Sequence, residues 1–187
     1  YVCFYEHKSF ELLKKIKVDG IKINTSDLNN NFLLKSAGKS KLPINLSVGA
    51  SKFQEIKKSF KVLKKYRSKV NLLYGLQNFP TKIDDVNLEK LKFLKDQFNL
   101  NIGYQDHCEG NSPEGLHLPI LSLGYGVKIL EKHICLNRNK NGFDYQSALK
   151  PVEFSNFVKK IRLAEKSIGQ KFSNKFSRSE RKYRDFQ

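Results

Sequence analysis

Short apolar runs alternate along the chain with longer stretches in which apolar residues recur every three or four positions. The short runs are typical of β-strands, and the periodic stretches are typical of amphipathic helices. We expect strands at residues 2–5, 20–24, 43–47, 70–75, 100–104 and 126–133. Six successive strand–helix units predict parallel strands that are joined by right-handed crossovers.

Several of the expected helices carry signals at their boundaries. Ser51 and Gln54 have the spacing of a capping box at the start of the third helix, and Gly38 is expected to close the second. Pro151 is expected at the first position of the last long helix, and Gly169 just past its end.

Polar residues recur two apart at or just beyond the ends of four expected strands. The pairs are Lys22 and Asn24, Asn45 and Ser47, Gln105 and His107, and Glu131 and His133. Residues two apart share one face of a strand, and in a (β/α)₈ barrel the strand ends build the active site. A doubly wound open sheet, the alternative, gives near-continuous apolar strands. We therefore expect an α/β fold of the TIM (β/α)₈-barrel type.

A complete barrel of this type has eight units and about 250 residues, whereas this chain has 187 residues and shows about six units. We therefore expect an incomplete barrel over residues 1–170 that lacks its first two units. Residues 171–187 are basic and polar, and we interpret them as a linker or tail. An open arc of six strands exposes two long edges, which favour pairing with other chains.

Composition narrows the class of protein. Lysine and arginine number 35 against 18 aspartates and glutamates, which gives a net charge of +17. The lysines are spread over several expected helices, so a nucleic-acid-binding protein is the less favoured interpretation. No apolar run approaches the ~18 residues of a membrane span, and no signal peptide is visible. Three scattered cysteines without a CxxC pair favour a reducing compartment, and we expect a cytoplasmic location.

Two histidines are the sharpest candidates for chemistry. His107 and His133 each end an expected strand, and these two strands should be neighbours. Imidazoles that converge from adjacent strand ends suit a first-row divalent ion with further positions open to water and substrate. Hydrogen-bonded histidines that bind no metal are the open alternative. His7 and His117 fall on helices, where solvated or packing roles are more common.

Three further polar residues each have two interpretations. Lys22 stands in an otherwise apolar strand, so it should pair either with an anionic ligand or with an acid on a neighbouring strand. Ser47 precedes a helix start and either presents its hydroxyl to an anion or belongs to a tight turn. Asp144, in a polar loop, either holds a polyol or forms a turn.

Several runs resemble the sialic acid synthase family. They are GIKINTSDLNN, PINLSVGAS, FPTKIDDVNL, IGYQDH and, above all, ILEKHICLNRNKNGFDYQSALKPVEF. The family comprises the phosphoenolpyruvate-condensing N-acetylneuraminate synthases and their legionaminate and pseudaminate relatives. The resemblance extends to about residue 170 and implies that residues 1–170 form the condensing barrel.

The resemblance implies a metal-dependent transferase of surface-polysaccharide biosynthesis. The enol carbon of phosphoenolpyruvate would add to the open-chain aldehyde of an N-acylated hexosamine, and water would then displace phosphate. The product would be a nonulosonic acid. The metal, typically Mn²⁺ with Mg²⁺ or Co²⁺ as alternatives, would be held by His107 and His133. Full-length members of the family form homodimers.

The resemblance also assigns substrate-binding positions. Lys22, Thr25 and Ser47 match the phosphoenolpyruvate site, and Asp144 matches the aspartate that holds the acceptor sugar. Glu131 matches the glutamate two residues before the metal histidine, and Lys22 and Glu131 are the expected catalytic groups.

Four substrate-site positions depart from the family pattern. Gln105 replaces a serine that contacts phosphoenolpyruvate, and Gln77 and Phe79 replace an asparagine and a tyrosine near the acceptor. Gly75 stands where the family has the cysteine of a Leu-His-Cys strand end. These departures affect the expected identity of the acceptor sugar more than the expected condensation reaction.

The family's first two strands supply an acid and a lysine that this chain lacks, and its C-terminal domain is also missing. A catalytically incomplete fragment that acts only with a partner chain is therefore the alternative function, and a basic nucleic-acid-binding protein is a weaker one.

Overall fold

The computed structural model describes residues 1–13, 15–140, 142–169 and 175–186. Six parallel strands form one sheet in chain order. They are β1 (Val2–Cys3), β2 (Ile21–Ile23), β3 (Ile44–Ser47), β4 (Val70–Tyr74), β5 (Asn101–Asp106) and β6 (Ile129–Lys132). Each strand begins and ends within a few residues of its expected range; β5 runs two residues further, and β6 is shorter.

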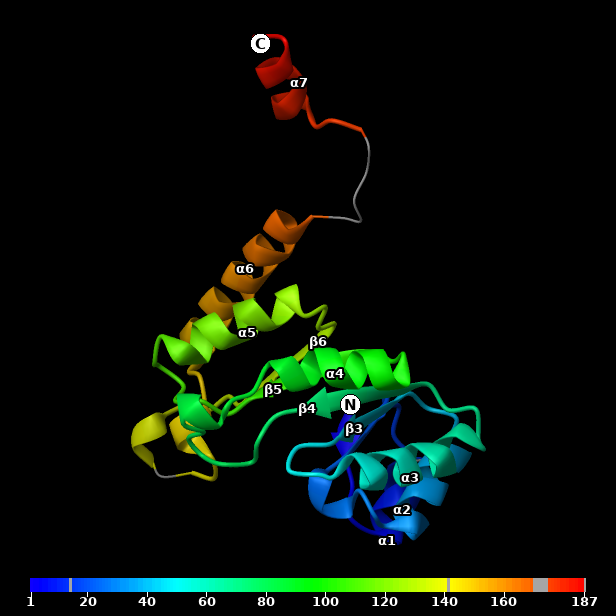
Figure 1. Ribbon diagram of the computed structural model, residues 1–187. Helices are drawn as coiled ribbons and strands as arrows, with labels where there is room; N and C mark the ends of the chain where they lie inside the picture. The colour runs from blue at the N-terminus through cyan, green and yellow to red at the C-terminus, as the bar shows by residue number, and fades with distance from the viewer. Residues whose placement is uncertain (14, 141, 170–174, 187) are drawn as a thin grey trace.

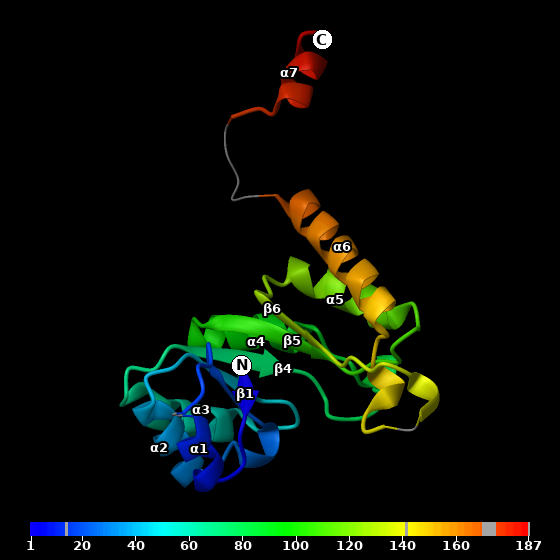
Figure 2. The ribbon, with the colours of Figure 1, turned by 180° about the vertical axis from the view of Figure 1, so that it is seen from behind.

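A helix follows each strand, as expected. The helices are α1 (His7–Leu13), α2 (Asn31–Lys39), α3 (Phe53–Lys64), α4 (Glu89–Phe98), α5 (Glu114–Gly124) and α6 (Pro151–Ile168). Figures 1 and 2 show that these helices lie along the outside of the curved sheet in chain order. Sequence order is therefore preserved around the arc, which is the arrangement of a (β/α) barrel wall rather than of a doubly wound sheet.

The two faces of the sheet differ in chemistry. Ile21, Ile23, Ile44, Leu46 and Leu72 are fully buried on the outer face, in one apolar cluster with residues of the surrounding helices. The positions between them are polar and lie on the inner face, because successive strand residues point to opposite sides. The outer face therefore holds the core, and the inner face is left for polar groups.

An asparagine ladder lines the lower part of the inner face. Asn71 donates from Nδ2 to Oδ1 of Asn45 at 2.8 Å, and Asn101 donates from Nδ2 to Oδ1 of Asn71 at 3.3 Å. Asn45 and Asn71 are register partners, and so are Asn71 and Asn101. The ladder joins β3, β4 and β5 below the strand ends and gives the buried amides of Asn45 and Asn71 hydrogen-bond partners.

One ion pair shows that the sheet is strongly curved. The Nζ atom of Lys22, on β2, lies 2.6 Å from Oε1 of Glu131, on β6. Strands four places apart in a flat sheet would be separated by roughly 19 Å, because neighbouring strands are about 4.8 Å apart. The sheet must curl for this pair to form, so the expectation of an incomplete barrel is confirmed.

Two boundary predictions are wrong. The capping residue of α3 is Lys52, whose backbone N–H donates to Glu55 at 2.8 Å, so the box lies one residue after Ser51 and Gln54. Gly38 lies inside α2 rather than beyond its end. A Cβ atom on Gly38 would lie 2.4 Å from the ring of Tyr66, so packing, not helix termination, requires glycine here.

The two boundary predictions for the last long helix are confirmed. Pro151 is the first residue of α6, and Gly169 follows its last residue with φ +74°, a conformation that favours glycine.

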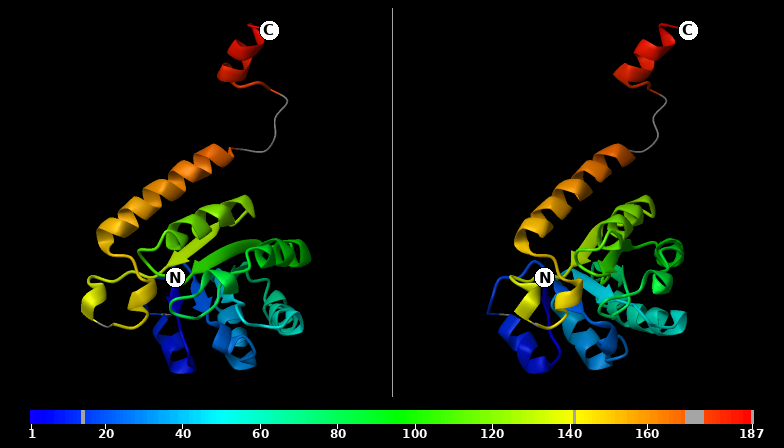
Figure 3. Two further views of the ribbon diagram at one scale, coloured as in Figure 1. Left: turned by 60° about the vertical axis from the view of Figure 1, so that its left-hand side comes forward. Right: turned by 90° about the vertical axis from the view of Figure 1, so that its left-hand side faces the viewer.

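The basic tail contains a short helix, α7 (Arg178–Arg184), all of whose residues are exposed. Residues 171–174, where the expected tail begins, lie outside the described residues. Figure 3 shows α7 away from the sheet and its helices. Among the described residues, no helix combines the length and the apolar character that crossing a membrane requires.

Candidate functional site

Three rings meet beyond the carboxyl ends of β5 and β6. The ring centroids of His107 and His133 are 5.1 Å apart. Phe79, from the loop after β4, lies edge-on to both, at 4.8 Å from His107 and 5.4 Å from His133. The structure therefore brings together the two histidines that sequence patterning singled out, and it adds Phe79 as the residue that packs against both.

The neighbours of His107 fix which of its nitrogens carries a proton. The Nδ1 atom is hydrogen-bonded to the backbone carbonyl of Leu76. A carbonyl can only accept, so Nδ1 carries the proton and Nε2 keeps its lone pair. Burial lowers the pKa of His107 below its usual value by removing water from the charged form. A neutral imidazole held in this way is the form that ligates metals.

His133 is more exposed than His107, but its pKa is shifted in the same direction. Burial lowers the pKa of His133 as well, and the carboxylate of Asp144 opposes that shift. The Nε2 atom of His133 lies 4.0 Å from Oδ2 of Asp144. Asp144 has φ +56° and begins a short turn, so both of its expected roles, as a turn former and as a polar group at the site, fit its position.

Backbone contacts tie the surrounding loops to the histidines. The carbonyl of His107 accepts hydrogen bonds from the backbone N–H of Thr81, at 2.8 Å, and from Oγ of Ser147, at 2.6 Å. The carbonyl of His133 accepts from the backbone N–H of Leu149 at 2.9 Å. Ser147 is fully buried, and sequence reasoning gave it no role. The sequence feature that could have singled out Ser147 is its place in the Ser-Ala-Leu run after Asp144.

A second group of polar side chains lies lower on the inner face. Oε1 of Glu131 accepts from Nζ of Lys22, at 2.6 Å, and from Nε2 of Gln105, at 2.7 Å. The side chains of Lys22 and Glu131 are 20% and 31% exposed. Of the two interpretations of Lys22, the structure shows the ion pair, but its acid comes from across the barrel and not from a neighbouring strand.

Three buried oxygens of expected substrate-binding residues make no hydrogen bond within the described part of the chain. They are Thr25 Oγ1, Ser47 Oγ and Gln105 Oε1. Buried polar atoms are rarely left without partners, because each such atom costs roughly 1–3 kcal/mol. All three residues were predicted to bind substrate, and their free oxygens are available to a polar ligand inside the barrel.

The sequence neighbours of the two histidines form a separate ion pair on the outer face. Asp106 pairs with Lys132, and each side chain is only 1% exposed. Asp106 Oδ1 also lies 3.2 Å from the hydroxyl of Tyr104. The carboxylate that precedes His107 in sequence therefore points away from the site, and its contact is structural: it locks the ends of β5 and β6 together.

The structure shows the surroundings of two positions, Gln77 and Gly75, that depart from the family sequence pattern. Gln77 is exposed, and no contact within the described residues joins it to the histidine cluster. At Gly75, an added Cβ atom would lie 2.1 Å from the carbonyl oxygen of Gln105. Only glycine fits this strand end, so the cysteine expected there would clash.

The site offers a divalent metal ion two nitrogen ligands. His107 and His133 fit such a role, because their pKa values favour the neutral form and their rings are adjacent. No cluster of three or more histidine, cysteine, aspartate or glutamate side chains with metal-binding geometry occurs in residues 1–13, 15–140, 142–169 and 175–186. The remaining ligands of a bound ion would therefore be water or substrate.

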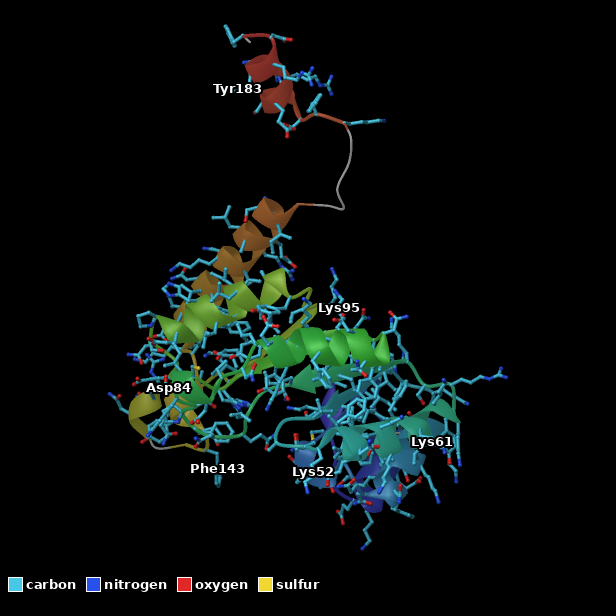
Figure 4. All side chains as sticks on the ribbon, viewed as in Figure 1. Lys52, Lys61, Asp84, Lys95, Phe143 and Tyr183 are labelled. Atoms are coloured by element: carbon cyan, nitrogen blue, oxygen red, sulfur yellow. The ribbon has the colours of Figure 1, made fainter. Side chains whose placement is uncertain are left out.

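Exposed lysines lie along several elements rather than around this site. Figure 4 shows Lys52, Lys61 and Lys95 at or on α3 and α4, outside the barrel. This distribution agrees with the interpretation of the net charge as a solvated surface.

Comparisons with known proteins identify similar chains. The sequence model of the NeuB family matches residues 3–173. The chain is 36% identical over 163 residues to an uncharacterized protein, MJ1065, of Methanocaldococcus jannaschii, covering 87% of this chain and 47% of that one. It is 31% identical over 181 residues to the N,N'-diacetyllegionaminic acid synthase of Campylobacter jejuni, covering 95% and 52%. The chain thus spans about half the length of these curated relatives.

Solved structures agree on the fold. The N-acetylneuraminic acid (sialic acid) synthetase of Leptospira borgpetersenii, in complex with citrate, superposes with a TM-score of 0.89 at 28% identity, covering 98% of this chain and 62% of that one. The phospho-2-dehydro-3-deoxyheptonate aldolase of Thermotoga maritima superposes with a TM-score of 0.77 at 17% identity, covering 91% and 52%. The second likeness shows the fold alone.

We predict that Asp106→Asn lowers the free energy of unfolding by about 3–5 kcal/mol, because it leaves Lys132 charged and buried without its partner. Urea denaturation measures the loss. Glu165→Gln removes an acid from an exposed pair with Arg162 and should change stability by at most about 0.5 kcal/mol. Equal losses in the two variants would contradict the structural role of the buried pair.

We predict that the free energy of unfolding falls as the pH drops below about 6.5, the ordinary pKa of histidine. The folded chain has the lower histidine pKa, so the unfolded chain binds more protons in this range and gains stability relative to the folded state. Urea denaturation between pH 5.5 and 7.5 without divalent metal measures the slope. His107→Asn should reduce the slope, whereas Asn at the exposed His117 should not. An unchanged slope in His107→Asn would refute the assignment.

Proposed function

The chain belongs to the NeuB family, and from this premise we propose that it carries the condensing site of a nonulosonic acid synthase. Several relatives are named as synthases of N,N'-diacetyllegionaminic acid, pseudaminic acid or N-acetylneuraminate 9-phosphate. One observation in the structure supports the proposal most. Lys22 and two oxygens without a hydrogen-bond partner among the described residues, Ser47 Oγ and Gln105 Oε1, lie on the inner face below two adjacent neutral imidazoles.

The substrates of the proposed reaction are phosphoenolpyruvate and an N-acylated hexosamine. The enol carbon of phosphoenolpyruvate forms a bond to the aldehyde carbon of the open-chain sugar, whose oxygen takes up a proton. Water then attacks the former enol carbon, and phosphate leaves as its C–O bond breaks. The product is a nonulosonic acid of the sialic, legionaminic or pseudaminic type.

The anionic substrate lies on the inner face in this proposal. Lys22 offers a positive charge, and the hydroxyls of Thr25 and Ser47 offer donors that have no acceptor among the described residues. These groups hold the carboxylate and phosphate in a fixed orientation toward the aldehyde, which lowers the entropic part of the barrier. The carboxylate of Glu131 lies on the same face and accepts a proton from the attacking water.

A metal ion is part of the proposal. His107 and His133 would hold it, and we expect Mn²⁺, with Mg²⁺ or Co²⁺ as alternatives. Its contribution is Lewis acidity toward the aldehyde oxygen. Asp144 orients the acceptor hydroxyls beside His133, and Phe79 packs against both imidazoles and fixes their planes.

The acceptor end of the site differs from the family pattern at Gln77 and Phe79. Phe79 presents a ring edge to the histidines where a hydroxyl would otherwise stand. We therefore propose a class of acceptor, the N-acylated hexosamines, and not one particular sugar. A homodimer belongs to the same proposal, because the family resemblance implies it.

A second candidate function is a half-barrel that turns over only with a partner chain. The open arc favours it, because within the described residues β1 pairs only with β2 and β6 only with β5. Binding of metal and phosphoenolpyruvate without turnover would support this candidate.

We predict that His107→Ala and His133→Ala each weaken Mn²⁺ binding at least tenfold, because each removes one of two nitrogen ligands. Isothermal titration of the metal-stripped chain measures affinity, and His117→Ala is the matched control. Phosphate release from phosphoenolpyruvate with a panel of N-acylhexosamines measures turnover. Unchanged Mn²⁺ affinity in both site variants, or condensation in the presence of a chelator, would contradict the proposed role.

A further inference from the structure

Lys22 is already neutralised by a group of the chain itself. Its Nζ atom lies 2.6 Å from Oε1 of Glu131, and the same oxygen accepts a 2.7 Å hydrogen bond from Nε2 of Gln105. A carboxylate only accepts hydrogen bonds, so the amide nitrogen of Gln105 must face Glu131. Glu131 is therefore held by two donors that come from different strands, β2 and β5.

The same region contains donors without an anion. The Oγ atoms of Ser47 and Thr25 are buried and make no hydrogen bond in the described part of the chain. Ser47 follows Asn45 on the same face of β3, and Asn45 is the register partner of Lys22. Lys22 and the Ser47 hydroxyl thus form a partly used anion receptor: Glu131 already balances the charge of Lys22, whereas the hydroxyl has no hydrogen-bond partner among the described residues.

We propose that Glu131 is an internal anion, which occupies Lys22 in the ligand-free chain and is exchanged for the carboxylate or phosphate of the substrate. This inference rests on the proposed function for the identity of that substrate. Gln105 is the positioning residue in the exchange, because its amide still holds the carboxylate once Lys22 has turned to the ligand. The glutamate thus stays inside the barrel when its salt bridge opens.

The exchange has a measurable cost. An incoming anion must break the Lys22–Glu131 pair before it gains the lysine, so the pair competes with the ligand. The two side chains are 20% and 31% exposed, which makes the pair accessible to solvent ions and open to exchange. Glutamine at position 131 keeps the shape and an acceptor oxygen for both donors but removes the competing charge.

The test is isothermal titration of the 187-residue chain with phosphoenolpyruvate and, separately, with inorganic phosphate. We expect Glu131→Gln to bind each anion about three- to fivefold more tightly than the unmodified chain, the upper part of the range that the loss of one partly exposed ion pair produces. Lys22→Met should lose binding of both. Glu153→Gln is the matched control, because it makes the same charge change in a pair with Arg138 of similar exposure. It should leave both affinities within twofold.

A second measurement needs no substitution. The side-chain carboxyl ¹³C resonance of Glu131 should shift when the unmodified chain is saturated with inorganic phosphate, since Lys22 then leaves the carboxylate. Equal or weaker anion binding by Glu131→Gln, or a bound anion with no shift of this resonance, would overturn the exchange and leave the proposed function standing. Tighter phosphate binding by Glu131→Gln without any binding of phosphoenolpyruvate would support the exchange and overturn the proposed function. If neither the unmodified chain nor Glu131→Gln nor Glu153→Gln binds phosphoenolpyruvate or phosphate, the exchange is overturned.

Discussion

The contact between Lys22 and Glu131 depends on the curvature of the whole sheet. The two side chains start on strands four places apart and meet at 2.6 Å, which only a curled sheet allows. The same curvature turns the inner face into a concave surface. Gln105 meets Glu131 as its register partner on the adjacent strand, and Ser47 lies on the same inner face. The polar site follows from the shape of the arc more than from any single loop.

The fold and the inner face were predictable from the sequence because strands have a period of two. Lys22, Asn45 and Glu131 interrupt apolar strands at alternate positions, and the structure places them on the face opposite the core. Convergence of His107 and His133 followed from the parallel order, since the ends of neighbouring parallel strands meet at one edge. Local spacing and topology were enough for these residues.

Other contacts depend on distances that no local pattern encodes. The partner of Lys22 could not be chosen from the sequence, because it lies 109 residues away and across the barrel. Asp106 precedes His107 in the sequence, yet strand alternation turns its side chain outward to Lys132. Ser147 was missed because its role is a hydrogen bond to a backbone carbonyl 40 residues away. Gly38 was misassigned because its constraint is the ring of Tyr66 and not the end of its helix.

The central claim is that the two histidines and the inner-face lysine build one site for a metal ion and an anionic substrate. Pulsed electron paramagnetic resonance of the Mn²⁺-loaded chain with phosphoenolpyruvate tests it most directly. The account predicts hyperfine couplings from two imidazole nitrogens, which disappear in turn with His107→Ala and His133→Ala, together with a ³¹P coupling that is lost in Lys22→Met. Bound Mn²⁺ without nitrogen couplings, or without a phosphorus coupling when phosphoenolpyruvate is present, would contradict it.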